Sequence, residues 1–147
     1  IFFRMFSKTC EHAIRAMIYI AQRSGDGERV GIKDIAKSRE APEHFIAKIL
    51  QELSRKNLVL SVKGPNGGFY HTHESAQSTL ADIVKTIDGD KIFSGCGLGL
   101  KQCSESHPCP IHHEFKKVRA GMQRMLEKAR IGTLTRELEN QLTFLKR

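Results

Sequence analysis

Apolar side chains recur at helical spacing in the first part of the chain. They begin after Ser7, a residue type that caps helix N-termini, and they stop at Gly25 and Gly27. The positions that share this face are Ala13, Ile14, Met17, Ile18 and Ala21. The pattern predicts a first amphipathic helix with one face in the core.

Two more helical patterns follow a polar turn. The segment "IKDIAKS" (32–38) is short, and "PEHFIAKILQELSRKN" (42–57) is longer, with Pro42 suited to a first helical turn. The apolar stripe of the longer segment is Phe45, Ile46, Ile49, Leu50 and Leu53. A short helix, a tight turn and a longer helix favour a helix-turn-helix, although small helical domains also contain such pairs by chance.

The next segment changes from helical to strand character. In "LVLSVKGPNGGFYHT" (58–72), two runs of strand-forming residues flank a turn of Pro, Asn and Gly, which predicts a β-hairpin. A hairpin directly after a helix-turn-helix is the wing of a winged-helix domain. "STLADIVKTIDG" (78–89) then predicts a short capped helix that ends at Gly89.

A long amphipathic helix is expected from about residue 114 to residue 130, followed by a short one at 133–142. With no compact domain downstream to cover the long helix, its apolar stripe predicts a dimer interface between two copies of the chain. The alternative is that the helix packs back on the winged domain. The stripe consists of Val118, Met122, Met125, Leu126 and Ala129.

These elements define a mainly α fold with a small β wing. The expected organisation is a winged helix-turn-helix domain at 5–90, a cysteine-bearing loop at 91–112, and a dimerisation helix with a C-terminal helix at 113–147. With 147 residues, the chain is long enough for one compact domain with an appended element.

The charge indicates a polyanionic partner. The 24 Lys and Arg residues exceed the 16 Asp and Glu residues, giving a formal net charge of +8. No window approaches 18 consecutive apolar residues, and "IFFRMF" lacks the cleavage site of a signal peptide, so we expect a soluble cytoplasmic protein that does not bind a membrane. Residues 1–4 are expected to precede a natural start at Met5.

The second helix of a helix-turn-helix enters the major groove of double-stranded DNA, so its outward positions are the expected base readers. Lys48 suits guanine, Gln51 suits adenine, and basic residues on the helix end and the wing suit phosphates. The tip of the wing suits the minor groove. The expected DNA-binding set is Ser7, Lys8, His44, Ala47, Lys48, Gln51, Arg55, Lys56, Lys63 and Asn66.

Three of the four cysteines lie in one short stretch, "CGLGLKQCSESHPCPIHH" (96–113). In a reducing compartment such a group indicates metal binding or catalysis before disulfides. The spacing of Cys96, Cys103 and Cys109 lacks the close C-x2-C pairs of most structural zinc sites. Wide gaps threaded with glycine favour an iron-sulfur cluster, which still needs a fourth ligand such as His112 or a carboxylate. Zinc and metal-free redox thiols are the alternatives.

The remaining cysteine and four of the other histidines are not expected to be primary metal ligands. Cys10 is expected to be a small packed residue of the first helix. His71, His73, His107 and His113 are expected at the surface, and His113 is close enough to be a spare ligand.

The chain resembles the family of winged-helix bacterial regulators represented by IscR, NsrR and RsrR. The matching pieces are "SKTCEHAIRAM", the recognition helix followed by "LVLSVKGPNGGFY", then "TLADIV" and the segment that ends in "CPIHH". The resemblance covers nearly the whole chain. It implies a dimeric transcription factor, often a repressor, with a cluster that senses redox state, nitric oxide or cluster supply.

The resemblance also implies a ligand set. Cys96, Cys103 and Cys109 match the three cysteines of the family, and His112 matches the fourth ligand of IscR-type proteins. Glu11 matches the position from which NsrR-type and RsrR-type proteins reach the cluster of the other subunit. The first helix departs from RsrR in carrying Arg15, and the first cysteine gap has six residues where IscR has five. A 4Fe-4S site with Glu11 in trans and a 2Fe-2S site with His112 both remain open.

The resulting expectation is a homodimeric repressor that binds a pseudo-palindromic operator. No phosphate loop, nucleophile elbow or second redox motif accompanies the cysteines, which argues against an enzyme or an electron carrier. The alternatives are a thiol-switched or zinc-switched regulator and a cluster-free regulator that acts through a partner enzyme.

Overall fold

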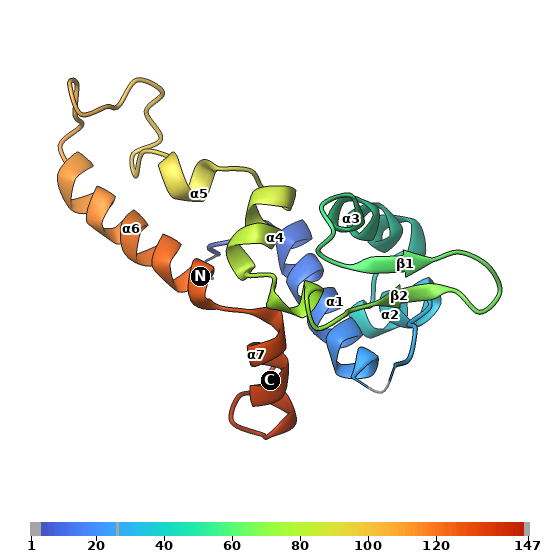
Figure 1. Ribbon diagram of the computed structural model, residues 1–147. Helices are drawn as coiled ribbons and strands as arrows, with labels where there is room; N and C mark the ends of the chain where they lie inside the picture. The colour runs from blue at the N-terminus through green and yellow to red at the C-terminus, as the bar shows by residue number, and fades with distance from the viewer. Residues whose placement is uncertain (1–3, 26, 146–147) are drawn as a thin grey trace.

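The computed structural model describes residues 4–25 and 27–145, and the helix bundle and the wing are visible in Figure 1. Of residues 1–4, which were expected to precede a natural start at Met5, residues 1–3 lie outside the described residues, as do residues 146–147 of the expected segment 113–147. The elements, in chain order, are α1 (Lys8–Ser24), α2 (Ile32–Arg39), α3 (Glu43–Arg55), β1 (Leu60–Val62), β2 (Gly68–Tyr70), the 3-10 turn η1 (Ser75–Gln77), α4 (Leu80–Ile87), α5 (Lys91–Ser94), α6 (His112–Lys128) and α7 (Ile131–Glu139).

Helix α1 is the centre of the core. The Ser7 hydroxyl accepts a hydrogen bond from the backbone N–H of Cys10, which caps the helix as its sequence predicts. Met17 and Ile20 are fully buried, and the helix packs against α2, α3, α4, α7 and β2. Cys10 is also fully buried, so its expected role as a packed residue is confirmed.

The two strands of the wing are antiparallel, with Ser61 opposite Phe69. A further bridge joins Phe69 to Val30, just before α2, and fastens the wing to the helical body. Gly68 is required here because its φ is +151° and an added Cβ would lie 2.7 Å from the carbonyl oxygen of Val30. The winged helix-turn-helix fold is therefore confirmed, and it is mainly helical.

The C-terminal helices differ in their limits from the expected ones. Helix α6 ends at Lys128 because Ala129 and Arg130 are extended and pair with the segment before α4. The backbone N–H of Leu80 donates to the Ala129 carbonyl at 2.8 Å, and the N–H of Ile131 donates to the Ser78 carbonyl at 2.9 Å. Helix α7 consequently begins at Ile131, earlier than predicted. No helix within the described residues is long and apolar enough to cross a membrane.

Helix α6 extends away from the body, and the loop between α5 and α6 lies at its far end (Figure 1). Val118 and Met125 of the expected dimer stripe are 55% and 49% exposed. Leu126 differs, because it is fully buried in its own chain, where α6 packs against α4. The stripe therefore combines an intrachain contact at Leu126 with an uncovered apolar surface at Val118 and Met125.

The prediction that His71 is a surface residue was wrong. His71 is 8% exposed because β2 leads it against α1, where its Nε2 lies 3.2 Å from the Met17 carbonyl oxygen. Its Nδ1 lies 3.1 Å from the Ser75 hydroxyl. A carbonyl only accepts, so Nε2 carries the proton. Burial lowers the pKa of His71 to about 4.

The buried His71 predicts that the protein loses stability as the pH falls. The folded protein holds the His71 imidazole neutral. Below the ordinary histidine pKa of 6.5, the unfolded chain therefore binds more protons than the folded chain does. Stability is therefore complete above about pH 6.5 and falls as the pH drops toward 4, by about 2 kcal/mol at pH 5. Urea unfolding at pH 7 and pH 5 should show a smaller loss in His71→Gln than in the parent. His73→Gln, at an exposed position nearby, should lose as much as the parent; equal losses in all three would contradict this assignment.

Candidate metal centre and nucleic-acid interface

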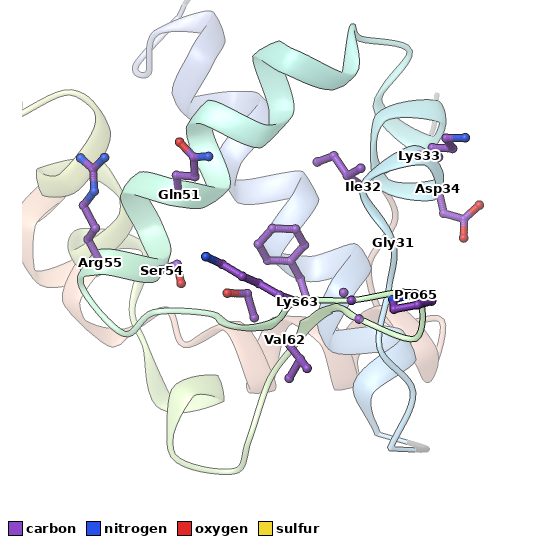
Figure 2. A pocket seen from close by; sticks show the side chains of 15 residues that line it. Gly31, Ile32, Lys33, Asp34, Gln51, Ser54, Arg55, Val62, Lys63 and Pro65 are labelled. Atoms are coloured by element: carbon purple, nitrogen blue, oxygen red, sulfur yellow. The ribbon is translucent and has the colours of Figure 1, made fainter.

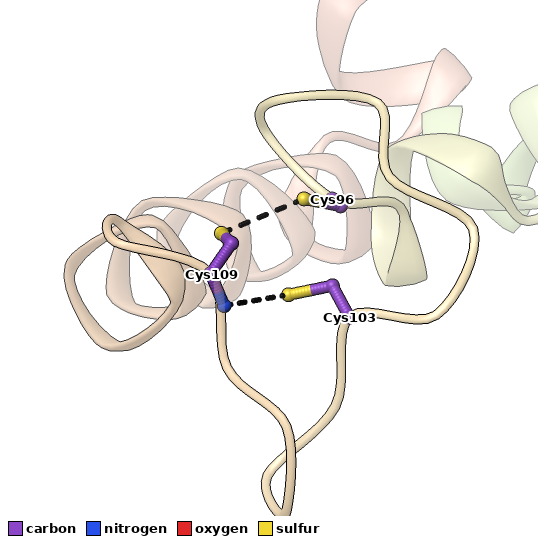
Figure 3. A group of neighbouring side chains, drawn as sticks. All are labelled: Cys96, Cys103 and Cys109. Carbon is purple, nitrogen blue, oxygen red and sulfur yellow. Dashed lines mark hydrogen bonds between the residues drawn. The ribbon is translucent and has the colours of Figure 1, made fainter.

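The side chains of the three clustered cysteines converge between the two ends of the α5–α6 loop (Figure 3). Cys96 follows α5, Cys103 lies midway along the loop, and Cys109 precedes α6. Their Sγ atoms all lie within 4.8 Å of one another, and Cys96 Sγ is 3.6 Å from Cys109 Sγ. All three are free thiols. Three soft ligands thus converge as a metal centre requires.

Close packing of the loop against α6 produces this convergence. An added Cβ at Gly97 would lie 2.9 Å from the Phe115 ring, so only glycine allows the chain to pass the helix there. The Arg119 guanidinium donates to the Gly95 carbonyl oxygen at 2.6 Å and ties the end of α5 to α6. The start of the loop, beside Cys96, is therefore held by residues outside the cysteine group.

The local surroundings shift the pKa values of Cys96 and Cys103 in opposite directions. Backbone N–H groups of Leu100 and Leu98 point at the Cys96 sulfur and lower its pKa to about 7. The N–H of Cys109 favours the Cys103 thiolate, but burial and the two neighbouring thiols outweigh it, and the pKa of Cys103 is raised. A cysteine that ionises near neutral pH beside other cysteines is a suitable start for metal binding, which displaces the remaining protons.

His112 lies beside the cysteine group. Its Nδ1 is 3.1 Å from Cys103 Sγ, and its side chain is only 7% exposed. The other ring nitrogen, Nε2, is buried without a hydrogen bond and lies 3.4 Å from Glu105 Oε1, in an orientation that does not make a full hydrogen bond. Glu105 also pairs with Lys116 of α6, which lowers the pKa of its carboxyl group. Sequence reasoning identified His112 and missed Glu105.

Glu11 lies on α1 in a different environment. Its carboxylate pairs with Arg4 at 3.3 Å, and its side chain is 39% exposed. The two residues share a cavity of about 390 Å³ with Lys8, His12, Arg15, Arg39 and Glu40. Within one chain, Glu11 belongs to neither of the two groups of convergent ligand atoms found among the described residues. A role for Glu11 at the cluster would require the partner subunit.

The donor set suits an iron-sulfur cluster. Three thiols within 4.8 Å supply the ligands that such clusters prefer, and the neighbouring imidazole is a type of fourth ligand that they accept. The remaining convergent group, Glu105, His112 and His113, uses the same imidazole. His113 is exposed, as expected.

Most of the expected DNA-reading residues are exposed. His44, Lys48 and Gln51 are exposed on α3, whereas Ala47 is half-buried. Lys63 and Asn66 are exposed on the wing, and Arg55, Lys56 and Lys8 are also exposed. The Ser7 hydroxyl and N–H both bond to the Asp88 carboxylate, so these groups are engaged within the chain.

A groove of about 930 Å³ separates α3 from the wing. Figure 2 shows Gln51 and Arg55 on the α3 side and Lys63 on the wing side. Lys33 of α2 also lines the groove, and sequence reasoning did not select it because it belongs to the short first helix of the pair. A groove with exposed cations on both walls suits a phosphate backbone.

Comparisons with known proteins agree with this architecture. The family model Rrf2, described as iron-dependent transcriptional regulator, matches residues 6–137. A protein of Aquifex aeolicus named as an HTH-type transcriptional regulator is 33% identical over 138 residues, which covers 92% of each chain. The HTH-type transcriptional regulator NsrR of Oceanobacillus iheyensis is 24% identical over 139 residues and covers 94% of each chain.

Solved structures share the fold at low sequence identity. CymR, the global cysteine regulator of B. subtilis, superimposes with a TM-score of 0.74 at 20% identity, over 90% of this chain and 97% of CymR. IscR of T. potens gives a TM-score of 0.73 at 20% identity, over 97% of this chain and 94% of IscR. These similarities establish the arrangement of helices and wing.

Proposed function

Because the chain belongs to the Rrf2 family of DNA-binding transcriptional regulators, we propose that it is a homodimeric repressor whose DNA affinity depends on an iron-sulfur cluster. The family consists of regulators and not of enzymes. The observation that carries the proposal is the convergence of Cys96, Cys103 and Cys109 on the loop between α5 and α6.

Cys96, Cys103 and Cys109 would hold the cluster, with His112 as the fourth ligand. The 3.1 Å approach of His112 Nδ1 to Cys103 Sγ supports this choice over Glu11, which pairs with Arg4 of its own chain. When bound, the cluster would supply a redox-active centre that also reacts with nitric oxide. A ligand set within one chain favours the 2Fe-2S form that His112 suits.

Packed elements connect this loop to the DNA-binding face. Helix α6 packs against α5 and α4, and α4 packs against α3 and α1. A change in how the loop holds α5 and α6 therefore bears on α4, which contacts the recognition helix directly. Such a change alters DNA affinity only by the difference in stability between the two arrangements.

The dimer would form through the exposed part of α6. Val118 and Met125 present apolar surface there, and a two-fold axis would place two α3 helices in successive major grooves. Half-sites about 34–36 Å apart are the geometry that such dimers read. In this assembly, residues 5–90 form the DNA-binding unit, residues 91–112 the cluster segment, and residues from 113 onward the dimerisation unit.

Purification without oxygen tests the cluster. We expect brown protein that contains iron and acid-labile sulfide and absorbs in the visible range. Colourless protein that holds zinc or no metal would overturn the cluster proposal. It would favour the alternative of a zinc-switched or thiol-switched regulator, to which the 3.6 Å separation of Cys96 Sγ and Cys109 Sγ is suited.

A further inference from the structure

We propose that Glu105 is a positioning residue for the cluster, holding the His112 imidazole so that Nδ1 faces the cysteine group. This inference rests on the proposed function, in which His112 is the fourth ligand. It assigns a role to a carboxylate outside the ligand set, and to Lys116, which pairs with that carboxylate.

The contacts form a continuous series from α6 to the cysteine group. Lys116 of α6 pairs with Glu105 Oε1, which lies 3.4 Å from His112 Nε2. On the opposite side of the same ring, His112 Nδ1 lies 3.1 Å from Cys103 Sγ. The two ring nitrogens therefore face two different partners, a carboxylate and a thiol.

Because His112 is buried, its Nε2–H depends on the Glu105 carboxylate for an acceptor. Its side chain is 7% exposed, and Nε2 is buried without a completed hydrogen bond. A buried N–H without a partner is costly, and among the described residues the nearby Glu105 carboxylate offers Nε2 an acceptor. The 3.4 Å distance places the Glu105 carboxylate within reach of Nε2–H.

The chemical consequence concerns the tautomer of the ring. A carboxylate that accepts from Nε2–H keeps the proton on Nε2 and leaves the lone pair on Nδ1, where the cysteine group is. It also increases the electron density of the ligating nitrogen. Carboxylates that orient metal-ligating histidines in this way contribute about 10–100-fold to metal affinity.

Lys116 supports the carboxylate. It lies four residues after His112 on α6, one helical turn further along, and so holds Glu105 above the imidazole. Lys116→Met should weaken cluster retention in the same direction as loss of Glu105, but by a smaller factor, because the carboxylate itself remains.

The test compares cluster-loaded variants prepared without oxygen. Glu105→Ala is expected to release iron to an excess of the chelator EDTA about 10–100-fold faster than the parent. Its cluster should also have a higher reduction potential, because the ligating nitrogen is less electron-rich. Glu105→Gln keeps an acceptor oxygen for Nε2–H and should recover much of the retention.

Glu114→Ala is the matched control. Glu114 is an exposed carboxylate in the first turn of α6 that pairs with Lys117 at 3.3 Å, and among the described residues it is not part of the ligand group that converges on His112. This variant should release iron at the parent's rate. Pulsed electron paramagnetic resonance of the reduced parent should show coupling to one histidine nitrogen, and Glu105→Ala should alter that coupling.

The outcomes separate this inference from the proposed function. A loaded parent whose Glu105→Ala variant keeps the parent's release rate and potential would overturn the positioning role and leave the cluster proposal intact. A loaded parent without nitrogen coupling would also overturn it, because His112 would then not be a ligand. A parent without iron and sulfide would overturn both.

Discussion

Replacement of Cys103 with alanine is expected to abolish cluster binding in protein purified without oxygen. Cys103 contacts two other members of the site, since its Sγ lies 3.4 Å from the Cys109 backbone N and 3.1 Å from His112 Nδ1. The variant removes one of three thiolates, and the two that remain supply too few soft ligands. Iron and sulfide analysis together with the visible spectrum should show nearly complete loss.

Cys10→Ala is the matched control for this substitution. Cys10 is fully buried on α1, and burial raises the pKa of its thiol to about 12, so it has no thiolate to offer. Cys10→Ala should retain the parent's iron and sulfide, although loss of a packed sulfur makes it less stable. Equal cluster content in Cys103→Ala and the parent would contradict the assigned ligand set.

The double variant Val118→Glu and Met125→Glu is expected to dissociate the dimer. Both side chains are about half exposed in one chain, so the substitutions leave the core of the protomer intact. In the proposed dimer they would bury like charges without partners, which costs several kcal/mol. Sedimentation velocity should show monomers at concentrations about 100-fold above those at which the parent is dimeric.

Leu126→Ala tests whether α6 uses Leu126 to pack within its own chain and a different set of side chains to form the dimer. Leu126 is fully buried where α6 packs against α4 of the same chain. Its truncation should therefore lower the free energy of unfolding by about 2–5 kcal/mol. Its folded form should dimerise like the parent. A parent that sediments as a monomer, or a dimer unaffected by the two glutamates, would contradict the proposed interface.

Local sequence signals predicted the winged-helix part well. The Ser7 cap, the apolar stripe of α3 and the turn before Gly68 each depend on neighbouring residues, which a single sequence reveals. The end of α6 could not be predicted in this way. It depends on pairing between Thr79 and Arg130, which are far apart in the chain.

Burial and side-chain orientation explain the other differences. His71 was expected at the surface, but it directly follows β2, which leads its ring against α1. Glu105 was not selected because an acidic residue in a polar loop has no distinctive spacing. Its relation to His112 arises only when the loop folds back on α6.

Control of DNA affinity by the cluster can be measured directly. The most direct test is to select duplexes from a random DNA pool with cluster-loaded and with cluster-stripped protein, and then to measure both forms on the enriched duplex by fluorescence anisotropy without oxygen. We expect a pseudo-palindromic site and affinities that differ at least about 10-fold between the two forms, with Cys103→Ala matching the stripped form. Equal affinities of the loaded and stripped proteins would contradict control by the cluster.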